Sequence, residues 1–550
     1  MVRRASYTQW RISRRVVLLF VVAVIMRSLL MWAQGAPARG TPPPDQGRGG
    51  PPPGPPPVVP KSLVANAEPA RTCESLTTVT LPDTTIASAT VDTGNATVPA
   101  SCRVTAVVSH PPAADRITIW IALPMNSWNG RFQGVGGGGF SGGSAGAVAP
   151  PLRAGYAAGS TDTGHEGGSG SFALDASGRL NWQAIRNNAY LGIHEMTVTG
   201  KALAQAFYGT APQRAYFNGC STGGRQGLSE AQRFSADYDG ILAGAPAINW
   251  TKLHVEQMWG TVVMLDSNTV VASCKFAAAT AAAVAACDGL DGVTDGVIEY
   301  PKACTYDPKA LVGTTAGDCG TMTDADAAVI RAIWEGPRRR DGSFLWHGLE
   351  RGGDFNGLSG TGGTPLAPRP NGITLEWWRY FLNEDPQWTW TGLTRAAYEQ
   401  YFDRSTEQFG AVLATDQPDL SAFRARGGKI VMWHGWSDPL IYPGGSIDYY
   451  TRVQQAMGGP DKTAEFFRFF LAPGVGHCGG GPGPAPSGQF EAVVRWVEEE
   501  KAPGTLDAIR RDQTGTVIRS RILCPYPRVA RYKGKGSTDA AENFECRTGS

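Results

Sequence analysis

The chain has 550 residues, including 70 glycines and 39 prolines, and a formal charge of +2 at pH 7. This length exceeds that of one ordinary domain, and we expect a main domain with a large insertion. The nearly balanced charge, without a basic stripe or a long charge run, argues against nucleic acid as a partner.

The N-terminus has the features of an export signal. Several arginines precede an apolar run at residues 16–26, which is short for a membrane span. Residues 1–36 are therefore predicted to be a signal peptide, with an uncleaved anchor as the alternative. No stable membrane span is expected after cleavage, and the mature protein is expected to be secreted or periplasmic. Residues 37–65 are rich in proline and glycine and are predicted to be a linker.

The ten cysteines predict disulfide bonds. An even number of cysteines behind an export signal indicates five bonds formed in an oxidising compartment, although spacing alone does not give their connectivity. There is no CxxC pair, which argues against a zinc site.

Residues 66–247 carry strand and helix patterns with a Gly-rich loop between them, where the backbone must approach another group closely. The predicted elements are, in chain order, strands at 102–108 and 116–123, the Gly-rich loop at 136–143, a helix at 194–208, a strand at 214–218 and a helix at 225–233.

Residues 248–425 differ in character, because an Ala-rich helix, Asp/Gly turns and many tryptophans occur there without regular β/α alternation. We predict that they form an inserted lid domain. The β/α pattern then resumes, and residues 426–550 are predicted to complete a catalytic domain begun by residues 66–247. The elements predicted in this last part are strands at 429–435 and 466–472 and a helix at 489–501.

Ser221 lies in a Gly-x-Ser-x-Gly pattern between a predicted strand and a predicted helix. A sharp strand–turn–helix connection exposes a serine hydroxyl, which still needs a base to take its proton and an acid to orient that base. A chance glycine loop is the alternative. The flanking strand and helix favour a nucleophile.

His477 is the predicted base and Asp438 the predicted orienting acid. His477 lies in a Gly-rich loop after a strand, and Asp438 follows the predicted strand at 429–435. The order Ser221, Asp438, His477 is that of α/β-hydrolases. Of the rival histidines, His434 is expected to pack or to hydrogen-bond behind the site, and His165 to be structural or near the pocket. An ordinary turn aspartate is the alternative role for Asp438.

An ester-cleaving serine also needs two backbone N–H groups for the oxyanion. Thr222 is predicted to supply one of them, and Gly138 or Gly139 the other. A phosphate-binding loop is the other use of such glycines, but no Walker or dinucleotide pattern is present.

Together these motifs resemble the tannase/feruloyl esterase family, whose mark is Cys-Ser, then Asp, then His-Cys. Here the marks are Cys220-Ser221, Asp438 and His477-Cys478, and the similarity covers about residues 70–547. The resemblance implies an α/β fold of the α/β-hydrolase type with a lid inserted after the nucleophile. It also implies a Cys220–Cys478 disulfide. Family pairing further suggests two more bonds and leaves the last two by elimination: Cys287–Cys304 and Cys524–Cys546, then Cys73–Cys102 and Cys274–Cys319.

The predicted lid contains three aspartates within eight residues, separated by glycines. Such a loop can hold a hard cation, although its spacing is not that of an EF-hand and a plain Asp-Gly turn explains it equally well. The resemblance implies a structural Ca²⁺ in the lid. Its ligands would be the side chains of Asp288, Asp291 and Asp295 and the carbonyls of Val293 and Val297.

The resemblance implies a secreted serine carboxylesterase that hydrolyses esters of aromatic acids, feruloyl or galloyl esters among them, through an acyl-enzyme. A mono(2-hydroxyethyl) terephthalate hydrolase is the alternative, and it would need a cation such as Arg379 or Arg395, for which surface roles are the simpler explanation. A peptidase or lipase with the same triad and a non-catalytic calcium-dependent binding protein are the rivals from other classes. Several lid aromatics could stack on an acyl group or form lid core: Trp377, Trp378, Tyr380, Phe381 and Trp388.

Overall fold

The computed structural model describes residues 60–65 and 68–549. The predicted signal peptide and most of the predicted linker therefore lie outside the described residues. The elements reported below belong to one compact unit. Within the described part of the chain, no helix is long and apolar enough to cross a membrane.

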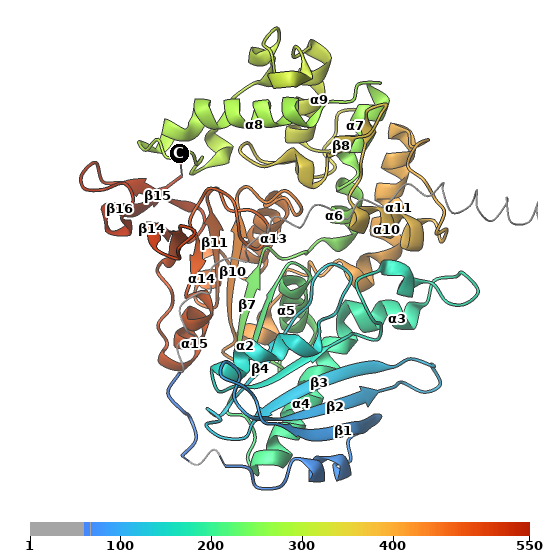
Figure 1. Ribbon diagram of the computed structural model, residues 1–550, viewed down its shortest axis with the longest axis vertical. Coiled ribbons are helices and arrows are strands. Elements are labelled where there is room, and N and C mark those ends of the chain that lie inside the picture. Colours follow the sequence, from blue (N-terminus) through green and yellow to red (C-terminus); the bar gives the residue numbers. More distant parts are fainter. Residues whose placement is uncertain (1–59, 66–67, 550) are drawn as a thin grey trace, which may run out of the picture. The chain divides into compact units, whose positions relative to one another are not determined.

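A nine-stranded sheet forms the centre of the described part, in the order β1-β2-β3-β5-β4-β6-β7-β10-β11 (Figure 1). The pairs from β1 to β5 are antiparallel, and every pair from β5 to β11 is parallel. This mostly parallel sheet, connected through helices, confirms the predicted α/β class. The strands are β1 (Thr84–Asp92), β2 (Ser101–Val108), β3 (Ile117–Pro124), β4 (Arg131–Val135), β5 (Ala157–Thr161), β6 (Arg214–Cys220), β7 (Gly240–Gly244), β10 (Lys429–Gly435) and β11 (Phe467–Ala472).

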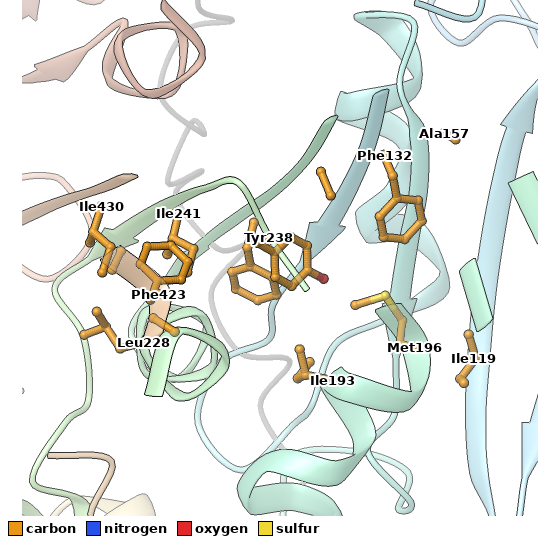
Figure 2. Close-up of a cluster of buried hydrophobic side chains, with 14 of the residues drawn as sticks. Ile119, Phe132, Ala157, Ile193, Met196, Leu228, Tyr238, Ile241, Phe423 and Ile430 are labelled. Atoms are coloured by element: carbon orange, nitrogen blue, oxygen red, sulfur yellow. The ribbon is translucent and has the colours of Figure 1, made fainter. Parts of the chain in front are cut away.

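The central strands are apolar on both faces because helices cover both. On β6, Phe217 packs into the core that also holds residues of α4, whereas its neighbour Tyr216 packs into a second core with residues of α15. This alternation follows from the two-residue period of a strand. Figure 2 shows Met196 of α4 close to Phe132 of β4 in the first core.

The helices around the sheet are α2 (Ala149–Arg153), α3 (Trp182–Arg186), α4 (Gly192–Tyr208), α5 (Thr222–Arg233), α13 (Gly444–Ala456), α14 (Pro460–Ala464) and α15 (Gln489–Glu499). Three of them were predicted: α4 and α15 lie close to the predicted positions, whereas the helix predicted at 225–233 begins earlier. A π-turn at Asn187–Leu191 joins α3 to α4.

The chain between β7 and β10 is mainly helical and contains the predicted lid, whose function as a lid stays a prediction. Most of its buried apolar side chains belong to two clusters, one of which includes Phe140 from the Gly-rich loop. Trp377, Trp378 and Phe381 are at most 1% exposed, so they are core residues of the insertion. Its elements are α6 (Trp250–Glu256), α7 (Trp259–Asp266), α8 (Ser273–Cys287), α9 (Asp324–Glu335), β8 (Thr361–Gly362), β9 (Ala367–Pro368), α10 (Gly372–Glu376), α11 (Arg395–Leu413) and α12 (Ser421–Ala425).

The C-terminal part adds two small antiparallel sheets, β12-β13-β14 and β15-β16. Their strands are β12 (Ala485–Ser487), β13 (Leu506–Arg511), β14 (Val517–Leu523), β15 (Arg528–Tyr532) and β16 (Phe544–Thr548). All ten cysteines form disulfides, in the five pairs that the sequence analysis gave: Cys73–Cys102, Cys220–Cys478, Cys274–Cys319, Cys287–Cys304 and Cys524–Cys546.

Candidate active site

Ser221 occupies a sharp turn between the end of β6 and the start of α5. Its backbone has φ 63° and ψ −125°, a conformation that a residue with a side chain adopts only when its surroundings enforce it. The amide of Ser221 donates to the Gly244 carbonyl at 2.9 Å, and its carbonyl accepts from the Ala247 amide at 3.0 Å. The helix therefore begins immediately after the serine rather than at Arg225. This is the strand–turn–helix context of a nucleophile elbow.

The two glycines that flank this turn are required by close packing. A Cβ atom on Gly219 would clash with the backbone of Gly223, and one on Gly223 would lie 3.1 Å from the Gly137 carbonyl oxygen. Side chains at these positions would force the turn apart. The pattern around Ser221 thus reflects contacts both within the turn and with the Gly-rich loop.

Asp438 and His477 are brought together by loops after neighbouring strands. Nδ1 of His477 lies 2.8 Å from Oδ2 of Asp438, whose side chain is 0% exposed. Burial by itself would raise the pKa of Asp438, but hydrogen bonds from His434 and His477 outweigh it and hold that pKa well below the usual range. The carboxylate therefore stays ionised beside the imidazole.

The rival histidine His434 is also at this carboxylate. Its Nε2 lies 3.1 Å from Oδ2 of Asp438 and 2.8 Å from the Ile441 carbonyl oxygen, and its Nδ1 lies 2.9 Å from Oγ of Ser446. Because a carbonyl oxygen only accepts, Nε2 carries the hydrogen and donates. Together with the Ile441 amide, which donates to Oδ1 at 3.0 Å, His434 holds Asp438 in place.

The Cys220–Cys478 disulfide joins the nucleophile turn to the histidine loop. Its Cα atoms are 5.9 Å apart, although the two cysteines are separated by 258 residues in the sequence. Each cysteine is the chain neighbour of one predicted catalytic residue, Ser221 or His477. The bond therefore fixes the relative position of two segments that come from opposite sides of the insertion.

The predicted oxyanion loop is tied to the helix that follows the serine. Oγ1 of Thr222 donates to the Gly139 carbonyl at 2.5 Å. Gln226 accepts from the Gly137 amide at 3.0 Å and donates to the Gly142 carbonyl at 3.1 Å, so one side chain holds both ends of the loop. Sequence reasoning gave no role to Gln226. Gln226 lies one helical turn after Thr222, and this position could have indicated that it holds the Gly-rich loop.

His165 supports the same loop from the other side. Its Nε2 donates to the Phe140 carbonyl at 2.9 Å, and Nδ2 of Asn188 donates to the same oxygen at 3.0 Å. Burial lowers the pKa of His165 to about 4, so the ring is neutral at pH 7. His165 thus holds the loop and is not placed at the Asp438 carboxylate.

All three aspartates in the predicted calcium loop are engaged in other contacts, and Asp291 accepts from the Val293 amide at 3.0 Å. Asp288 accepts from the amides of Asp295 and Gly296 at 3.0 and 2.8 Å, which folds the loop around its carboxylate. Asp295 pairs with Arg521 at 2.6 Å and with Arg519 at 3.2 Å. In the described residues the three carboxylates do not gather within 4.8 Å of one another, so they do not form a closed cage.

The donor set nevertheless fits a hard cation. Asp291, Asp295 and Glu299 line a small cavity of about 10 Å³, roughly the volume of one water-sized sphere. Removal from water and the charge of Asp291 raise the pKa of Glu299 to about 8, and burial likewise raises the pKa of Asp291. Carboxylate oxygens in such surroundings suit Ca²⁺. The sequence analysis missed Glu299, which the acidic run of this loop could have indicated.

A cavity of about 750 Å³ lies away from these groups, between α15, α2 and the sheet. Its lining includes Gln133, Asn218 and Phe490 but none of Ser221, Asp438 and His477. This cavity is therefore not assigned as the site that holds the ester.

The comparison with known families supplies the deciding observation. The model of the family described as "Tannase and feruloyl esterase" matches residues 102–547. The chain belongs to this family. It is therefore a carboxylic ester hydrolase, and the matched region contains the predicted triad residues Ser221, Asp438 and His477.

Relatives in this family extend over most of the chain. A "Probable feruloyl esterase" from Arthroderma benhamiae is 40% identical, covering 81% of this chain and 85% of the relative. A "Mono(2-hydroxyethyl) terephthalate hydrolase" from Piscinibacter sakaiensis is 31% identical, covering 82% and 85%. The crystal structure of feruloyl esterase B from Aspergillus oryzae aligns with a TM-score of 0.76 at 27% identity, covering 86% of this chain and 100% of that one. This likeness confirms the α/β-hydrolase fold.

Proposed function

We propose that this family member hydrolyses esters of aromatic carboxylic acids with Ser221 as nucleophile, His477 as general base and Asp438 as the orienting acid. The observation that carries the proposal is the 2.8 Å contact between His477 and a fully buried Asp438, next to the disulfide that reaches the serine turn. The chemistry follows from the roles of such a triad.

Asp438 fixes the proton on Nδ1 of His477, because an ionised carboxylate only accepts hydrogen bonds. Nε2 of His477 then has a free lone pair that takes the proton from Oγ of Ser221 as the oxygen attacks the ester carbonyl. The same imidazole returns that proton to the leaving alcohol, and an acyl-enzyme forms. A water molecule then repeats the sequence, with His477 as its base, and releases the acid.

The tetrahedral intermediate needs donors for its oxyanion. We propose the amide of Thr222 as one and the amide of Gly138 or Gly139 as the other. The hydrogen bonds of Thr222 and Gln226 to the Gly-rich loop support this assignment, because they hold the loop against the start of α5. A preorganised loop reduces the reorganisation needed as charge develops.

Feruloyl, galloyl and related aromatic acyl esters are the proposed substrates, and the names of the relatives support this class. A terephthalate mono-ester is the second candidate, supported by one relative's name. The two predicted cationic residues have other contacts: Nε of Arg379 donates to the Trp388 carbonyl at 3.1 Å, and Arg395 donates to the Arg338 carbonyl at 3.2 Å. These contacts favour the uncharged aromatic esters.

The test is a comparison of kcat/KM for methyl ferulate, methyl gallate and mono(2-hydroxyethyl) terephthalate. We expect the first two to exceed the third. We expect Ser221→Ala to lose turnover by several orders of magnitude and to lose labelling by a serine-directed phosphonate. Retained turnover in Ser221→Ala, or hydrolysis of amide or triglyceride substrates alone, would contradict the proposal.

We also propose a structural Ca²⁺ held by Asp288, Asp291, Asp295 and the carbonyls of Val293 and Val297, with Glu299 close by. It would supply positive charge to the buried carboxylates and stabilise this loop. Finally, we propose that the protein works outside the cytoplasm, because five disulfides are typical of an oxidising compartment. N-terminal sequencing of the protein recovered outside the cytoplasm tests the export signal.

A further inference from the structure

A second cluster of ligand-type side chains lies behind the nucleophile helix. His194 belongs to α4, Glu230 to the last turn of α5, and Asp237 to the loop before β7. One ligand atom from each of the three lies within 4.8 Å of the others, and no other such group of three exists among the described residues. Nδ1 of His194 is 2.7 Å from Oδ2 of Asp237.

Glu230 is the unusual member of this cluster. It is 1% exposed, and no hydroxyl, amide or cationic group of the described residues donates to its carboxylate oxygens, whose side-chain partner is the carboxyl group of Asp237. A buried carboxylate whose partner is a second carboxylate, here that of Asp237, is costly when both groups are ionised. The arrangement requires a proton or a cation between these groups.

The protein's own cation nearby does not fill this place. The Lys201 ammonium donates to the backbone carbonyl of Asp237. Its charge acts on Glu230, but within the described residues no hydrogen bond joins it to that carboxylate. The neighbouring hydroxyls of Thr197 and Tyr238 are bonded to each other. Outside the cluster, none of these neighbouring groups donates to the Glu230 carboxylate.

We propose that His194, Glu230 and Asp237 form a binding site for Zn²⁺. One imidazole nitrogen and two carboxylate oxygens are a donor set that Zn²⁺ accepts, whereas Ca²⁺ prefers oxygen ligands alone. The His194 side chain is 28% exposed, which gives a route for the ion and room for a water as fourth ligand. The absence of a CxxC pair argues only against a zinc site made of cysteines, and the proposed site contains none.

The proposed ion would join α4 to α5. Ser221 stands at the start of α5 and Glu230 in its last turn, so the site lies at the opposite end of the helix from the serine. Its role would be structural: Zn²⁺ would neutralise two buried carboxylates and hold the two helices together. This site is independent of the ester chemistry and of the proposed calcium loop.

The test uses the untagged full chain, stripped of metal with EDTA and dialysed, and titrated calorimetrically with ZnCl₂. We expect one Zn²⁺ per chain at this site and a rise in Tm. Glu230→Gln and His194→Ala should each weaken binding by at least about tenfold. Glu195→Gln is the matched control, because Glu195 neighbours His194 on α4 but its side chain contacts His110. The Zn²⁺ affinity of this variant should equal that of the wild type.

A second measurement covers variants that fail to fold. Co²⁺ added to the wild-type chain should give the intense visible absorption of a four- or five-coordinate site. A weak, octahedral spectrum, no detectable Zn²⁺ binding, or equal Zn²⁺ affinity in the wild type, Glu230→Gln and His194→Ala would each overturn the proposal.

Discussion

Nε2 of His434 lies 3.1 Å from Oδ2 of Asp438, and both side chains are fully buried. This is the same carboxylate oxygen that faces His477. His434 therefore acts on the predicted base only through Asp438, by orienting the carboxylate and stabilising its charge. It is a positioning residue. The Ile441 carbonyl sets its tautomer, and the hydroxyl of Ser446 lies 2.9 Å from its Nδ1 and helps to hold the ring.

Replacing His434 should reduce turnover without weakening substrate binding. In His434→Gln, Asp438 loses one donor and its orientation is less restricted, so we expect kcat to fall by roughly 10–100-fold with KM nearly unchanged. Ser446→Ala should have the same effect in a weaker form. Steady-state kinetics on methyl ferulate measure both. A rise in KM at constant kcat would show that His434 contacts substrate instead.

Breaking the Cys220–Cys478 bond should damage activity more than breaking a disulfide elsewhere. Closing so long a loop stabilises the folded chain by about 5 kcal/mol in the entropy model, and this bond also fixes the serine turn against the histidine loop. We expect Cys220→Ser with Cys478→Ser to lower both Tm and kcat/KM. The matched control, Cys73→Ser with Cys102→Ser, should lower Tm while leaving kcat/KM of the folded fraction near the wild-type value. Wild-type kinetics in the first double variant would remove any catalytic role for the bond.

Much of this site could be predicted from the sequence because its residues occur in short, ordered motifs. The glycines around Ser221 indicate a nucleophile turn, and the chain order of Ser221, Asp438 and His477 indicates an α/β-hydrolase triad. The predicted start of α5 was wrong by three residues, because Gly223 and Gly224 are typical of a loop. In the structure these glycines allow α5 to pack against the Gly-rich loop and the end of β7. Close packing of backbone on backbone is not visible in local propensity.

The rest depended on contacts between segments far apart in the sequence. Gln226 reaches Gly137 and Gly142, which lie more than eighty residues earlier, and no local pattern indicates such a pair. The cluster of His194, Glu230 and Asp237 is likewise assembled by the packing of α4 on α5. For Trp377 and Trp378 the sequence left two roles open, stacking on an acyl group or forming lid core, and their burial in the insertion supports the second.

Gln226 should matter to the reaction through the loop that it holds. Gln226→Leu removes the hydrogen bonds at both ends of the loop, and we expect kcat to fall about 10–100-fold because the oxyanion donors are no longer held in place. Gln232→Leu is the matched control on the same helix, since Gln232 contacts Thr415 and Tyr449 instead. Kinetics on one aromatic ester compare the two. An equal loss in both variants would indicate general damage to α5.

The buried neutral histidines should make the fold less stable in mild acid. Burial lowers the pKa of His165 to about 4, whereas in the unfolded chain it is near 6.5. As the pH falls through 6.5, His165 takes up a proton in the unfolded chain, whereas in the folded chain it does so only near pH 4. The free energy of unfolding therefore decreases between these values, by at most about 3 kcal/mol for this residue.

Denaturant unfolding at several pH values, with the disulfides intact, measures this effect. His165→Gln should flatten the decrease between pH 6.5 and 4. His110→Gln should act in the opposite sense: burial lowers the pKa of His110, but the hydrogen bond and charge of Asp115 outweigh it and raise that pKa. The stabilisation from His110 is thus complete below pH 6.5 and is lost as the pH rises through the folded pKa. His110→Gln should consequently cost more at pH 5 than at pH 8, and identical pH profiles for the two variants would refute the assignment.

Removing calcium should destabilise the chain with little effect on the reaction itself. Without a cation, Asp291 and Glu299 face each other across a small cavity and repel when ionised. We expect chelation with EGTA to lower Tm by several degrees and Ca²⁺ to restore it, with kcat at 25 °C nearly constant. Asp291→Asn should abolish this dependence on Ca²⁺. Asp341→Asn is the control, because Asp341 is an exposed aspartate outside the loop, bonded locally to Ser343. If neither EGTA nor Ca²⁺ changes the Tm of the wild type, a structural calcium ion in this loop is excluded.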